Sequence, residues 1–159
     1  MARKLRSDST EEMVRFAQGA ERQIAPPSHV PMQDIDWPFW ESVVSEFARA
    51  EWTEHQLELA AMLARTMADL EENQRLLRLE GAVIERETYD KDGAVRRVVM
   101  VENSRSRSVH TFMGQVLALR RSLALHARAK SGTNHDAGKQ RAAGKKIERQ
   151  VSGELDLLA

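Results

Sequence analysis

One long stretch of the sequence, Trp52–Arg128, limits the folds open to this chain, because it predicts two long helices joined by a β-hairpin. Residues 53–80 predict the first helix, residues 82–101 the hairpin and residues 104–129 the second helix. An α-helix rises about 1.5 Å per residue, so each helix would be about 40 Å long. Two helices of similar length joined by a short connection are expected to pack side by side as an antiparallel pair.

Local signals define the boundaries of these elements. Thr53 can cap the first helix, and Gln56 three residues later completes a capping-box pattern. Asp92-Gly93 is a strong hairpin turn signal between two β-rich runs. The predicted fold class is therefore mainly α with one β-hairpin.

Two of these elements carry apolar surface that the chain itself does not obviously cover. The first long helix has leucines at heptad-like spacing and a second, alanine-rich face, and a helix with two apolar faces usually has two partners. The hairpin has two unpaired edges, which hairpins of neighbouring subunits could pair by closing a β-lined channel. The residues expected at such a subunit interface are Ala60, Ala61, Ala64, Ala68, Val83, Val95 and Val99.

The segments on either side of this core have different compositions. Residues 1–52 predict two or three short helices separated by tight breaks, as in a small helix-turn-helix DNA-binding unit. Residues 130–159 are rich in Gly, Lys and small polar side chains, which predicts a flexible basic tail. The chain thus divides into a helical DNA-binding region (1–52), an oligomerisation core (53–129) and a tail (130–159).

The neutral net charge of the chain conceals a strong asymmetry. Between Asp34 and Asp90 there are 14 acidic and 5 basic side chains, a net charge of −9. Between Arg105 and Arg149 there are 11 basic and 2 acidic side chains, a net charge of +9. This pattern indicates either neutralisation between paired helices or subunits, or a basic surface for a polyanion.

No residue pattern points to catalysis, a metal site or a cofactor. The chain has no cysteine, its five histidines are scattered, and Gly144-Lys145-Lys146 lacks the leading glycine and the hydroxyl of a phosphate-binding loop. No signal peptide and no apolar run of about 20 residues is visible, which predicts a soluble protein with no membrane partner. We therefore expect a binding protein rather than an enzyme.

Four short motifs resemble, in their order and spacing, the small terminase subunits of tailed double-stranded DNA bacteriophages. They are RSDS at Arg6–Ser9, PPSHV at Pro26–Val30, PFW at Pro38–Trp40, and Trp52-Thr53 leading into LELAAMLA. The closest resemblance is to phages that cut their DNA at cohesive ends. The resemblance implies helix-turn-helix domains around a helical core, in a ring-shaped homo-oligomer of about 8–10 subunits.

The same resemblance implies the partners and the setting of the protein. Such subunits recognise the packaging site in viral double-stranded DNA, and they recruit and regulate the large terminase subunit, an ATPase and nuclease. The protein would act in the host cytoplasm, transiently at the procapsid portal, and would be absent from the mature virion. A dimeric helix-turn-helix transcription regulator and a structural adaptor without DNA binding are the alternatives.

Particular contact residues are predicted from charge and composition, because no recognition-helix signature is visible. The leucines expected to bind the large subunit are Leu155, Leu157 and Leu158. The cations expected to contact DNA are Arg3, Lys4, Arg6, Arg15, Arg22 and Arg49 near the N-terminus, and Lys130, Lys139, Arg141, Lys145 and Lys146 in the tail.

Overall fold

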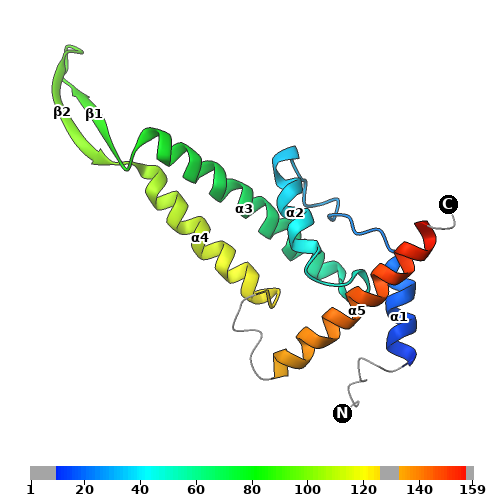
Figure 1. Ribbon diagram of the computed structural model, residues 1–159. Coiled ribbons are helices and arrows are strands. Elements are labelled where there is room, and N and C mark those ends of the chain that lie inside the picture. The colour runs from blue at the N-terminus through cyan, green and yellow to red at the C-terminus, as the bar shows by residue number, and fades with distance from the viewer. Residues whose placement is uncertain (1–9, 126–132, 157–159) are drawn as a thin grey trace.

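Five α-helices and one antiparallel β-hairpin make up the fold of the computed structural model, which describes residues 10–125 and 133–156 (Figure 1). The mainly α fold with one hairpin is thus confirmed. No helix in the described ranges is long and apolar enough to cross a membrane. The elements are α1 (Thr10–Ala20), a short 3₁₀ helix η1 (Asp34–Asp36), α2 (Trp37–Val44), a second 3₁₀ helix η2 (Arg49–Glu51), α3 (Glu54–Glu80), β1 (Val83–Tyr89), β2 (Val95–Glu102), α4 (Ser104–Ser122) and α5 (Thr133–Asp156).

The helices α3 and α4 lie side by side and carry the hairpin at their far end (Figure 1). The capping box that begins α3 is confirmed: the Thr53 hydroxyl oxygen accepts from the Gln56 amide at 3.3 Å, and the Thr53 amide donates to Gln56 Oε1 at 3.0 Å. Helix α3 ends at Gly81, whose φ of 86° lies in the region that favours glycine. Sequence signals therefore set both ends of α3.

Helix α4 ends at Ser122, earlier than the predicted end at residue 129. The cause is a left-handed residue, Ala124, with a φ of 54°. The amide of Ala124 donates to the Arg121 carbonyl at 3.0 Å and the amide of Leu125 donates to the Arg120 carbonyl at 2.8 Å. This is a Schellman motif, which usually uses glycine, so it was not predictable at an alanine.

The alanine-rich face of α3 is buried within this one chain. Ala60, Ala61, Ala64 and Ala68 are at most 2% exposed, and Leu63 is fully buried with them. The small side chains let α2 and α4 pack closely on α3. The sequence assigned these alanines to a subunit interface, but in the structure they fill the core instead.

The hairpin, in contrast, has no apolar layer packed on it from the part of the chain that the structure describes. Its strands pair in antiparallel register from Val83 opposite Glu102 to Tyr89 opposite Val95. Val83, Val95, Val98 and Met100 are between 50% and 64% exposed, and Val99 is partly buried. A two-stranded hairpin with exposed valines is marginal by itself, and its role in assembly stays a prediction.

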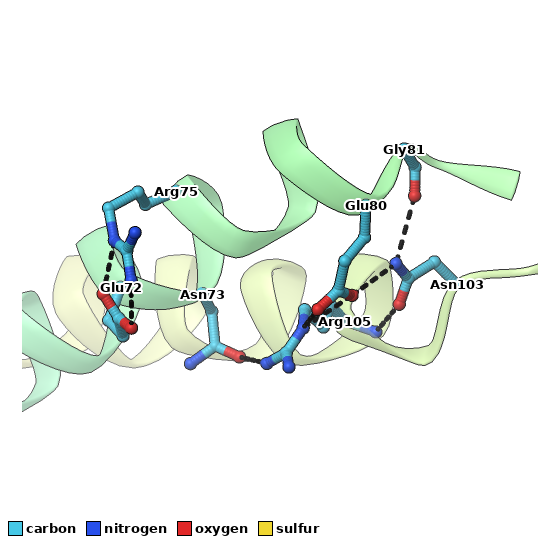
Figure 2. Close-up of polar contacts among 7 residues, drawn as sticks. All are labelled: Glu72, Asn73, Arg75, Glu80, Gly81, Asn103 and Arg105. Atoms are coloured by element: carbon cyan, nitrogen blue, oxygen red, sulfur yellow. Dashed lines mark hydrogen bonds and ion pairs between the residues drawn. The ribbon is translucent and has the colours of Figure 1, made fainter. Parts of the chain in front are cut away.

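A polar cluster joins the hairpin rigidly to the helix pair (Figure 2). The buried Asn103 side chain donates to Glu80 Oε2 at 2.9 Å and to the Gly81 carbonyl at 3.0 Å, and it caps α4 by accepting from the Arg105 amide at 3.0 Å. Arg105 Nε lies 2.8 Å from Glu80 Oε2. The hydrogen bond from Arg105, followed by that from Asn103, lowers the pKa of the Glu80 carboxyl. These bonds fix how the hairpin leaves the helices.

Residues 133–156 form helix α5, which differs from the flexible tail predicted for 130–159. Helix α5 packs against α1, at the end of the molecule opposite the hairpin (Figure 1). The N-terminal and C-terminal regions therefore meet in space.

Candidate nucleic-acid interface

The helices α1, α2 and α5, with η2 and the start of α3, form one unit that we call the end module. Its centre is aromatic: Trp40 and Trp52 are each 2% exposed. The Phe47 and Trp52 rings meet edge to face, with 4.9 Å between centroids. The Trp52 indole N–H donates to the Val44 carbonyl at 3.1 Å, so its one polar atom is satisfied. These contacts fix the position of η2 between α2 and α3.

Two contacts dock α5 on this aromatic centre. Gly144 is buried against α1: a Cβ atom at this position would lie 2.5 Å from Cε1 of Phe16, so only glycine fits. Three residues earlier, the Arg141 guanidinium lies 4.0 Å from the centre of the Phe47 ring. Both residues lie on the same helical face, which is therefore the inner face of α5.

An ion pair completes the docking of α5. Arg49 Nε lies 3.1 Å from Glu148 Oε1, and Arg49 also donates to the Ala20 carbonyl at 2.7 Å. Arg49 thus connects η2, the end of α1 and the inner face of α5. The Glu148 side chain is only 16% exposed, and a carboxylate in that setting needs the cation that Arg49 supplies.

A second predicted DNA contact, Arg22, is also engaged within the chain. Its guanidinium donates to the Trp52 carbonyl at 2.6 Å and to Glu54 Oε1 at 2.7 Å, which ties the segment after α1 to the start of α3. Arg15 pairs with Glu12 at 3.4 Å and keeps 52% of its side chain exposed. Arg22, Arg49 and Arg141 therefore each hold parts of the end module together.

One carboxyl group of the end module has a perturbed acidity. Burial raises the pKa of Glu51 above its ordinary value, although the Ala48 amide and then the Arg141 cation act to lower it. The Ala48 amide donates to Glu51 Oε2 at 3.1 Å. The partly buried position of Glu51 at the end of η2 explains this shift without any catalytic role.

The outer face of α5 carries the cations that remain exposed. Lys139, Lys146 and Arg149 are exposed, and Lys145 is half-buried at the edge of this face. Sequence reasoning included the three lysines but missed Arg149, because a disordered tail has no faces. The signal that could have identified Arg149 is helical spacing. Positions 139, 146 and 149 share one face of a helix, and positions 141, 144 and 148 share the opposite face.

A groove of about 920 Å³ lies beside α5. Trp40, Val44 and Phe47 form its apolar wall, and Arg49 and Lys145 lie at its edge.

Several other predicted site residues cannot be placed. Arg3, Lys4, Arg6, Lys130, Leu157 and Leu158 lie outside the described residues, and Leu155 lies in α5 without a described side chain.

The connections between the short helices are longer than the turn of about 3–4 residues in a helix-turn-helix unit. Residues 21–33 connect α1 to η1, and residues 45–53, which include η2, connect α2 to α3. Proline explains the first connection, because Pro26-Pro27 cannot continue a helix and Pro38 favours the first turn of the next. The predicted helix-turn-helix is not shown by this arrangement.

Comparison with protein families decides which kind of protein carries this fold. The model of the Hendrixvirinae small terminase family matches residues 1–159. The chain belongs to this family. This small terminase therefore has a role in phage DNA packaging, in agreement with the resemblance of its sequence motifs. Comparison with curated proteins gave no match for it.

The part of this small terminase that the structure describes offers no cluster of three or more side chains suited to hold a metal ion. Small terminases are in general DNA-binding regulatory subunits rather than catalytic ones. The end module, with its exposed cations, is accordingly the candidate surface for nucleic acid in this small terminase.

Proposed function

We propose that this protein recognises the packaging site in its phage DNA and recruits and regulates the large terminase subunit. The observation that carries the proposal is the family match over residues 1–159. We also propose that the phage cuts its DNA at cohesive ends, as the sequence motifs suggest. It leaves ATP hydrolysis and DNA cleavage to the large subunit.

The two ends of the molecule suit two different tasks within this function. The hairpin end has exposed apolar side chains and unpaired strand edges, which favour contact with other copies of the chain. The opposite end carries the exposed cations of α5, which favour contact with DNA. We propose that hairpins assemble the ring and that end modules bind DNA around it.

Ring assembly also explains how individually weak DNA contacts would suffice. Each end module offers only a few exposed cations, and a single phosphate contact is weak at physiological salt. A ring repeats the same surface in every subunit, so the modules bind one DNA molecule together with a high effective concentration. The residues at the C-terminal end, Leu155, Leu157 and Leu158, are proposed to bind the large subunit.

The assembly part of the proposal is tested on the hairpin. Val98 and Met100 lie on one hairpin face, opposite Glu87 and Glu85, and are 50% and 64% exposed. Replacing both with aspartate is expected to convert the ring to monomers at micromolar concentration, because buried unpaired carboxylates oppose association. Multi-angle light scattering measures the mass.

The matched control is Lys91→Glu in the hairpin turn, which changes charge without removing an apolar side chain. This variant should keep the mass of the wild-type assembly. A monomeric wild-type protein, or a Val98→Asp/Met100→Asp variant of unchanged mass, contradicts assembly through the hairpin.

A further inference from the structure

The described part of the outer face of α5 combines exposed cations and small residues with no acidic side chain among them. Its described exposed residues are Lys139, Ala142, Lys146, Arg149, Gln150 and Gly153. Apart from the neighbours Arg149 and Gln150, they recur at intervals of three or four residues, and together they form one stripe along the helix. No carboxylate lies on this stripe between positions 139 and 153, because the one acid in that interval, Glu148, faces Arg49.

We propose that this stripe is a sequence-independent binding surface for the phosphate backbone of double-stranded DNA. The proposal rests on the proposed function and assigns one part of it, backbone binding, to α5. Sequence recognition is left to other parts of the end module. Contacts to phosphates set affinity and position, whereas contacts to base edges set specificity.

The charge and reach of the stripe fit a duplex. Lys139 and Arg149 are ten positions apart, which is about 15 Å along a helix. Duplex DNA carries about one negative charge per 1.7 Å of its axis, so this length of duplex carries about nine phosphate charges on its two strands together. Lys145, Lys146, Arg149 and Gln150 surround a shallow hollow of about 420 Å³, and each can donate hydrogen bonds to phosphate oxygens.

The same stripe fits an acidic protein surface poorly. Protein interfaces usually have a buried apolar centre with large aromatic or aliphatic anchors. The only apolar exposed residues in the described part of this stripe are Ala142 and Gly153, which offer no such anchor. Small residues between cations instead allow the helix to approach a phosphate backbone closely.

The docking of α5 fixes the orientation of this surface relative to the end module. Gly144 against Phe16 and Glu148 against Arg49 fix the inner face of the helix. The cations of the outer face are consequently held in a fixed position on the surface of the end module, where Arg149 also lines the groove beside α5. A helix that was free in solution would spread the same charges over many orientations, at a larger entropic cost on binding.

The test uses the full-length protein with three exposed cations neutralised: Lys139→Gln, Lys146→Gln and Arg149→Gln. We expect a loss of affinity of at least about tenfold for packaging-site DNA and for shuffled DNA alike, and a decrease of about 2–3 in the slope of log K against log salt. The preference for packaging-site DNA should stay unchanged. Fluorescence anisotropy at several salt concentrations measures all three quantities, and near-ultraviolet circular dichroism verifies the fold.

The matched control neutralises three exposed cations of the α3–α4 helix pair, outside both the hairpin and α5: Arg65→Gln, Arg78→Gln and Arg107→Gln. It removes the same charge and should leave the salt slope close to that of the wild type. Three results would overturn the proposed surface. The α5 variant could keep the wild-type salt slope, the two triple variants could have equal effects, or the α5 variant could lose affinity for packaging-site DNA alone. A wild-type protein without preference for packaging-site DNA instead overturns the proposed function, whatever the variant does.

Discussion

Replacing Gly144 with leucine is expected to detach helix α5 from the end module. A Cβ at this position would lie 2.5 Å from Cε1 and 2.8 Å from Cζ of Phe16, whose side chain is only 1% exposed. A larger side chain in a closely packed core costs about 1–3 kcal/mol, because the neighbours cannot move aside. Once displaced, α5 also loses the contact of Arg141 with Phe47 and the ion pair of Glu148 with Arg49.

The control for this prediction is the same substitution at Gly153 of the same helix, where an added Cβ meets nothing within 4 Å. Leucine favours a helix by up to about 1 kcal/mol over glycine, so Gly153→Leu should stabilise α5 slightly. Hydrogen exchange of the α5 amides is the measurement. Exchange should become much faster in Gly144→Leu and slightly slower in Gly153→Leu. Equal protection in both variants would show that α5 does not dock on Phe16.

The second large effect is expected from Leu63→Ala in the middle of α3. Leu63 is fully buried among Ala60, Ala61 and Ala64, and truncation of a buried leucine to alanine costs about 2–5 kcal/mol of unfolding free energy. Urea unfolding, measured at one protein concentration because assembly adds stability, gives this difference.

Leu79→Ala provides the matched comparison on the same helix. Leu79 is 72% exposed, so its truncation should change the unfolding free energy by less than about 0.5 kcal/mol. The prediction fails if the two variants are equally stable. That result would mean that the core is not centred on this face of α3.

The helix pair and hairpin were predictable because short local sequence signals mark their boundaries. Thr53 and Gln56 form a capping box, and Gly93 has a φ of 79° in the turn that Asp92-Gly93 predicts. Such signals act over a few residues and do not depend on distant packing. The end of α4 was missed because Ala124, not glycine, takes the left-handed conformation.

Helix α5 was not predictable from composition because its inner face is not apolar in the usual way. It docks through a glycine, a cation over a ring and a carboxylate, at Gly144, Arg141 and Glu148. Each of these residues suggests a solvated tail when it is considered alone. Their partners Phe16, Phe47 and Arg49 lie 128, 94 and 99 positions earlier in the chain, so only the folded structure connects them.

The alanine stripe of α3 shows a different limit of sequence reasoning. Periodicity correctly indicated two apolar faces on this helix, but it does not say what covers them. Helices α2 and α4 both pack on α3 and bury Ala60, Ala64 and Ala68 inside the chain. The same limit applied to Arg22 and Arg49, whose charges suggested DNA contacts and whose guanidinium groups bind carbonyls and carboxylates within the fold.

The central claim, that this small terminase recognises packaging-site DNA, is tested most directly by competition binding. The full-length protein is bound to a labelled duplex that contains the packaging site of its phage and is competed with unlabelled duplexes at fixed salt. We expect the packaging-site duplex to compete at least about tenfold better than a shuffled duplex of the same length and composition, a difference of ~1.4 kcal/mol. Equal competition by the two duplexes would contradict the claim.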